Sequence, residues 1–139
     1  MINFYSENDF EINNQEQLIK WIVAVVESEG FNLGDVNFIF CNDDYLHKIN
    51  VEFLNHDTLT DIISFDYSVG KVLQGDIYIS TERVADNAKD YRVSFDNEIK
   101  RVMIHGILHY CGYQDKTTVQ TDLMRSKENH YLELLSTIT

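Results

Sequence analysis

Apolar residues recur along the chain at two kinds of spacing, and each kind predicts one type of element. Spacings of three and four residues, as among Leu18, Ile22 and Val25, are typical of helices. Short β-rich runs such as residues 61–65 are typical of strands. In chain order, the pattern predicts a strand at 2–6, a helix from Asn13 or Asn14 to Gly30, a strand at 36–40, a helix at 42–54, strands at 61–65 and 76–80, and helices at 81–93, 94–112 and from Thr117 or Thr118 to Leu135.

Residues that favour caps and turns separate these elements. Thr81 and Ser94 are expected to cap the helices that they begin, and Gly112 is expected to end the second of these. Segments 55–58 and 68–75 are expected to be a polar turn and a glycine-containing connection. The order β-α-β-α-β-β-α-α-α predicts an α+β fold, in which a small mixed β-sheet of about four strands packs with about five helices.

Length and targeting signals set the class of protein. A chain of 139 residues is expected to form a single domain, spanning 1–139. No apolar stretch approaches the ~18 residues that a membrane span needs. The N-terminal residues lack the basic and apolar regions of a secretory signal, so the cytoplasm is the expected location and no membrane partner is expected. In that reducing compartment, Cys41 and Cys111 are expected to be free thiols.

The charge is strongly acidic but unevenly distributed. The net charge of -12 by itself disfavours anionic partners. Residues 1–61 carry twelve acidic and two basic side chains, whereas eight of the 11 basic residues lie between Arg83 and Lys127. The field near that second region is compatible with an anionic substrate. The alternative is that the acidic excess only keeps the protein soluble.

The sequence that carries candidate chemistry is His105-Gly-Ile-Leu-His109-Tyr-Cys-Gly112-Tyr-Gln-Asp115. Histidines four residues apart lie on one face of a helix, about one turn apart, and can bind the same ion. A glycine three residues later can end the helix, so that Asp115 beyond the turn can offer a carboxylate oxygen to that ion. Three protein ligands that leave a fourth position for water are typical of a catalytic zinc site.

Other candidate residues have competing interpretations. Glu98, seven residues before His105, is either a partner for a histidine N–H or a first-turn carboxylate favoured by the helix dipole. Cys111 is expected to be a small buried side chain rather than a ligand. Gly106 stands where the H-E-x-x-H metallopeptidases have their general base, which argues against proteolysis. The remaining histidines have no partner at ligand spacing and are expected on the surface or in local hydrogen bonds: His47, His56 and His130.

These residues resemble the YbeY family of bacterial single-strand-specific, metal-dependent endoribonucleases. The family motif H-G-x-L-H-L-x-G-Y-D-H aligns without gaps with residues 105–115. The family segments L-N-x-x-Y-R, T-D-V-L-S-F and G-D-I-x-I-S align with residues 49–54, 60–65 and 75–80, and the run from Met124 to Glu128 resembles the family's ending.

The resemblance implies a zinc-binding ribonuclease that acts in maturation of the small-subunit ribosomal RNA 3′ end and in ribosome quality control. It also implies a fold similar to the metzincin proteases around the metal. Two positions depart from the family pattern: Asp115 replaces the third ligand histidine, and Leu54 replaces an arginine expected near the cleft. Arg101 or Lys116 is a candidate to replace that cation.

The expected function is therefore that of an endoribonuclease in which His105, His109 and Asp115 hold one zinc ion, with other divalent metals as alternatives. Single-stranded ribosomal RNA is the expected substrate, the ribosome or ribosomal proteins are further candidate partners, and no DNA is expected. Two other functions stay open: a non-catalytic, metal-containing ribosome-assembly factor, and another metal-dependent hydrolase such as a peptidase. The sequence does not identify a catalytic base.

Overall fold

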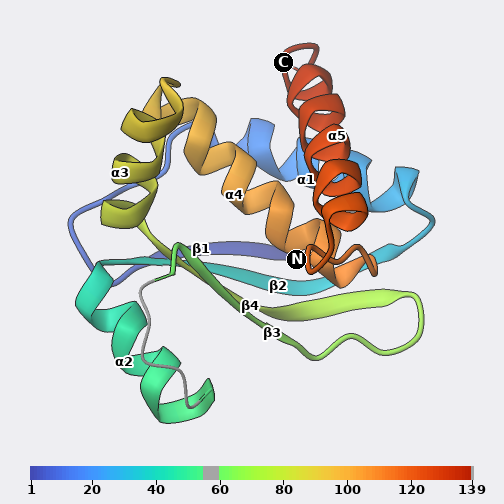
Figure 1. Ribbon diagram of the computed structural model, residues 1–139. Helices are drawn as coiled ribbons and strands as arrows, with labels where there is room; N and C mark the ends of the chain where they lie inside the picture. The colour runs from blue at the N-terminus through green and yellow to red at the C-terminus, as the bar shows by residue number, and fades with distance from the viewer. Residues whose placement is uncertain (55–59, 139) are drawn as a thin grey trace.

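The computed structural model describes residues 1–54 and 60–138 (Figure 1). Across these residues, the nine expected elements are present in the expected order. They are β1 (Ile2–Ser6), α1 (Gln15–Ser28), β2 (Asn32–Cys41), α2 (Asp43–Leu54), β3 (Ile62–Asp66), β4 (Val72–Ser80), α3 (Thr81–Tyr91), α4 (Phe95–Tyr110) and α5 (Thr118–Leu135). The polar turn expected at 55–58 lies outside the described residues.

The strands form one mixed sheet in the order β1-β2-β4-β3. The pairs β1–β2 and β2–β4 are parallel, and β3 pairs antiparallel to β4. Over the described residues, this four-stranded sheet and the five helices confirm the expected α+β fold.

The two sides of β4 face different cores, as the alternation of a strand requires. Ile77 and Ile79 belong to the main apolar core, which includes residues of α1, α4 and α5, whereas Tyr78 packs against a smaller cluster around Leu46 of α2. Figure 1 shows α1, α4 and α5 on one side of the sheet and α2 on the other. Helix α4 contacts the sheet as well as α1, α3 and α5, so it lies at the centre of the molecule.

Strand β4 begins earlier than the sequence indicates, and Gly75 explains the difference. The sequence places Gly75 in a connection, but it pairs with β2 and β3 within the sheet. A side chain there would collide with the Tyr110 hydroxyl and the Phe65 carbonyl oxygen. The Tyr110 hydroxyl donates a hydrogen bond to that carbonyl at 2.8 Å. The glycine therefore makes room for the end of α4 against the sheet.

At the N-cap of α1, Asn14 makes no side-chain capping hydrogen bond. The N-caps of the later helices agree with the sequence except at α3. Its N-cap is Ser80 rather than Thr81: the Ser80 hydroxyl accepts a hydrogen bond from the Arg83 N–H at 3.2 Å. Ser94 caps α4, and Thr117 caps α5 in a reciprocal capping box with Gln120. None of the helices in the described ranges combines the length and the apolar character needed to cross a bilayer.

Candidate metal centre

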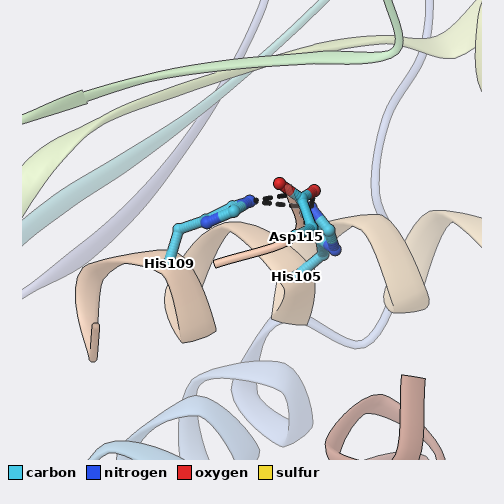
Figure 2. Close-up of side chains that lie close together, drawn as sticks. All are labelled: His105, His109 and Asp115. Carbon is cyan, nitrogen blue, oxygen red and sulfur yellow. Dashed lines mark hydrogen bonds and ion pairs between the residues drawn. The ribbon is translucent and has the colours of Figure 1, made fainter. Parts of the chain in front are cut away.

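The three candidate ligands lie together at the C-terminal end of α4 (Figure 2). The Nε2 atoms of His105 and His109 are 2.9 Å apart. Asp115 Oδ2 lies 3.2 Å from His105 Nε2 and 3.5 Å from His109 Nε2. All three ligand atoms fall within 4.8 Å of one another. Two imidazole nitrogens and one carboxylate oxygen form a donor set that suits a divalent ion such as zinc.

The turn after α4 brings Asp115 back to the histidines. Gly112 has φ 102°, a left-handed conformation that residues with a side chain rarely adopt. Its N–H donates to the His109 carbonyl at 3.0 Å, and the Tyr113 N–H donates to the Leu108 carbonyl at 3.1 Å. These two bonds form a Schellman motif, which ends the helix and reverses the chain.

The other nitrogen of each imidazole is held by an acceptor. His105 Nδ1–H donates to Glu128 Oε2 at 2.7 Å, and His109 Nδ1–H donates to the Tyr113 carbonyl oxygen at 2.9 Å. Because carboxylates and carbonyls only accept hydrogen bonds, the protons of the neutral rings lie on Nδ1 and the lone pairs on Nε2. Two lone pairs at 2.9 Å repel each other unless a cation or a proton lies between them. The arrangement could therefore hold a cation between two ligand nitrogens that are already oriented towards it.

The charges around His105 explain the pKa shifts in the site. Burial would lower the pKa of His105, but the hydrogen bond to Glu128 and the nearby charges of Asp115 and Asp61 outweigh burial and raise it. Burial would raise the pKa of Glu128, but His105 and Arg101 lower it. Without a metal, a proton on His105 thus satisfies the same negative surroundings that would attract a metal ion.

A cavity of about 280 Å³ opens beside His105. Its charged lining residues come from α4, α5 and the segments that precede β3 and α5, and they are Asp61, Glu98, Arg101, Asp115, Arg125 and Glu128. Burial raises the pKa of both Asp61 and Glu98. A carboxylate with a raised pKa is a stronger base than an ordinary one, so these two groups are candidates to accept a proton in the cavity.

Two arginines supply the positive charge of the cavity wall. Arg101 lies 3.1 Å from Glu128 Oε1 and 3.9 Å from Glu98, so its charge is largely used within the protein. Arg125, which the sequence did not indicate, lies 3.5 Å from Glu128 and keeps 51% of its side chain exposed. Lys116 is not among the described residues that line the cavity. Leu54, at the family's arginine position, is 40% exposed.

Glu128 has the role that was considered for Glu98, so that interpretation of Glu98 is wrong. Glu98 lies in the first turn of α4, as the alternative interpretation holds, and its nearest charged partner is Arg101. Glu128 had a detectable signal in the sequence. It falls on the buried stripe of α5 formed by Met124, Tyr131 and Leu135, where an acidic residue needs a partner.

The remaining candidates lie outside the cluster. Cys111 is partly buried, and burial raises the pKa of its thiol to about 12. His130 is exposed and its ring packs against Tyr131. His47 is partly buried, and His56 lies outside the described residues. Gly106 faces the sheet, where an added Cβ would meet Ile62 at 3.0 Å and Ile77 at 3.1 Å.

The family model and the curated relatives agree on one family. The family model described as Endoribonuclease YbeY matches residues 1–136. A protein of Flavobacterium johnsoniae named Endoribonuclease YbeY is 59% identical over 134 residues, covering 96% of this chain and 96% of its own. The protein of the same name from Amoebophilus asiaticus is 45% identical and covers 93% of this chain and 88% of its own. A solution structure of a Thermotoga maritima protein superimposes with a TM-score of 0.67 at 28% identity, covering 97% of this chain and 89% of that one.

Proposed function

Since the chain belongs to the YbeY family of endoribonucleases, we propose that it is a single-domain, cytoplasmic endoribonuclease that cleaves single-stranded RNA with one bound divalent ion. Zinc is the ion that the donor set favours. We place its action in ribosomal RNA maturation, at the 3′ end of the small-subunit RNA, and in ribosome quality control. The ribosome or its proteins are further candidate partners.

The observation that carries this proposal is the set of three converging ligand atoms from His105, His109 and Asp115. In addition, the Nδ1 atom of each imidazole is held by an acceptor, Glu128 for one ring and the Tyr113 carbonyl for the other. His105, His109 and Asp115 would hold the ion. A divalent ion in such a site supplies Lewis acidity at a phosphoryl oxygen and lowers the pKa of bound water.

The surrounding residues would bind the substrate and move protons. Arg125 has an exposed guanidinium in the cavity wall and is suited to contact a phosphate. Asp61 and Glu98 have raised pKa values and line the same cavity, so each is a candidate to accept a proton from the attacking hydroxyl. The nucleophile is water or a ribose 2′-hydroxyl.

The proposal is tested by zinc content and RNA cleavage with the purified protein. We expect about one zinc per chain and divalent-dependent cleavage of a single-stranded RNA, with a duplex of the same sequence left intact. The substitution His109→Ala should abolish stoichiometric zinc binding and cleavage, because it removes one of three ligands. His130→Ala is the matched control, because that histidine is exposed on α5 and lies outside the cluster. Full zinc content in His109→Ala would contradict the ligand assignment.

A non-catalytic assembly factor is the second candidate, and Leu54 is the feature that favours it. A leucine in place of the family's arginine removes a cation that could contact phosphate. If cleavage activity disappears on further purification while zinc stays bound, this second candidate is favoured. A peptidase is disfavoured because Gly106 offers no carboxylate where the H-E-x-x-H metallopeptidases have their general base, and a peptide-library assay tests it directly.

A further inference from the structure

A carboxylate at the end of α1 contacts the turn that follows α4. Glu29 is the C-cap residue of α1, and its side chain is only 10% exposed. It accepts hydrogen bonds from the hydroxyl of Tyr113 at 2.6 Å, from the hydroxyl of Tyr131, and from the ammonium group of Lys127 at 3.2 Å. Three donors from the turn and from α5 therefore meet at one acidic side chain.

Tyr113 connects this carboxylate to the metal centre. Its hydroxyl donates to Glu29, and its backbone carbonyl accepts the Nδ1–H of His109 at 2.9 Å. The ammonium of Lys127 lies 5.6 Å from the centre of the Tyr113 ring and adds a cation–π contact. The side chain of Tyr113 is thus anchored at its tip, while its backbone orients one ligand and leads within two residues to Asp115.

The Glu29 group is suited to remain ionised in this position. Burial would raise its pKa, but the bonds from Tyr113, Tyr131 and Lys127 outweigh burial and lower it. Hydrogen bonds to an ionised acceptor are shorter and stronger than those between neutral groups. The anchor at the tip of Tyr113 is therefore a strong one.

We propose that Glu29 is a positioning residue of the metal centre: through the Tyr113 hydroxyl, it fixes the turn whose carbonyl orients His109 and which carries Asp115. This inference rests on the proposed metal site. It assigns to the end of α1, 76 residues before His105 in the chain, a part in ordering the ligands. A purely structural Glu29 would stabilise the fold without affecting how His109 presents its Nε2 atom.

Two tyrosine substitutions separate the positioning role from a purely structural one. Each removes one hydroxyl that donates to Glu29, but only one of the two tyrosines also contacts His109. Tyr113→Phe breaks the path to His109, whereas Tyr131→Phe, on α5, leaves that path intact. We expect Tyr113→Phe to weaken zinc binding about three- to tenfold, measured by competition with a chromophoric chelator, while Tyr131→Phe stays within about twofold of the unmodified protein. Equal zinc affinities in the two variants would overturn the proposal.

A double-mutant cycle tests whether Glu29 acts through Tyr113. Glu29→Gln should also weaken zinc binding, and adding Tyr113→Phe to it should weaken binding no further, because both changes break the same path. Additive losses would overturn the proposal. If Glu29→Gln does not fold, the comparison of the two Tyr→Phe variants decides, since each removes a single oxygen atom.

A measurement on the metal-free protein keeps this inference separate from the proposed function. At alkaline pH, the ¹⁵N shifts of the His109 imidazole should show the proton on Nδ1, and Tyr113→Phe should populate the form with the proton on Nε2. An unchanged tautomer in Tyr113→Phe would count against the positioning role even if zinc affinity changed. Failure of the unmodified protein to bind zinc would instead contradict the proposed function, while the tautomer still decides the role of Glu29.

Discussion

The substitution Glu128→Gln isolates the group that orients His105. Glu128 is only 4% exposed. One of its oxygens accepts from His105 Nδ1 at 2.7 Å and the other accepts from Arg101 at 3.1 Å. A glutamine of the same shape has one oxygen and one NH₂ group, so it can accept from His105 or from Arg101 but not from both in this geometry. If the NH₂ group faces His105, the imidazole must accept at Nδ1 and carry its proton on Nε2, where it blocks metal binding.

Loss of such a partner costs about 10- to 100-fold in metal affinity, which corresponds to about 1.4–2.7 kcal/mol. The metal-free protein should also lose about 1–3 kcal/mol in its free energy of unfolding, because a buried donor is left unsatisfied. Zinc affinity is measured by chelator competition and stability by urea denaturation. Glu133→Gln is the matched control, since it removes the same charge from an exposed position of the same helix. Unchanged zinc affinity in Glu128→Gln would refute the role of Glu128 in orienting His105.

Two further predictions concern the metal-free protein and the turn. The pKa of Glu128 is lowered in the fold, so its ionised form stabilises the fold above its unfolded pKa of about 4.5, and this stabilisation is lost as the pH falls through the folded pKa. The pKa of His105 is raised, so its protonated form stabilises the fold below its unfolded pKa of about 6.5, and this stabilisation is lost as the pH rises through the folded pKa. The stability difference between the unmodified protein and Glu128→Gln, from urea denaturation across pH, should therefore be largest between those two folded pKa values; a difference that stays constant into the alkaline range would contradict this. Gly112→Ala should lower the free energy of unfolding by about 1–2 kcal/mol, because the φ of 102° strains an alanine although its Cβ would meet no atom within 4 Å. Gly70→Ala is the control for zinc affinity, because Gly70 has φ 59° in an exposed turn and belongs neither to the ligand cluster nor to the cavity lining. Only Gly112→Ala should reduce zinc affinity.

The sequence was sufficient where the determining interactions are local. Helix periodicity, the Ser94 and Thr117 caps and the bend at Gly112 all depend on residues within a few positions of one another. The meeting of the three candidate ligands is local as well, because a Schellman turn after His109 by itself returns the chain towards the preceding helical turn. The positions of these residues could therefore be inferred before any tertiary contact was known.

The sequence was insufficient where packing between distant elements decides. Gly75 has the appearance of a turn residue, and only the approach of Tyr110 shows why a strand needs it. Glu98 lies before His105 on the same helix, and Glu128 lies on the next helix. The packing of α5 on α4 brings Glu128, and not Glu98, into contact with His105. The Ser80 cap was missed by one residue because Ser80 and Thr81 are both good N-cap residues.

The same contacts link metal affinity to the packing of the last helix. Glu128 orients His105 from α5, and Glu29 at the end of α1 holds Tyr113, whose carbonyl orients His109. The two imidazoles are therefore oriented by groups that depend on how α5 and α1 pack. Linkage requires that whatever orders these contacts also strengthens metal binding, and that a bound ion stabilises the packing of α5 in return. Substitutions that loosen α5, far from any ligand atom, should therefore weaken the metal site, whereas substitutions on the exposed face of α2 should not. The positions of the three candidate ligands are determined locally by α4 and the turn after it, whereas their affinity for a metal ion depends on the packing of the other helices.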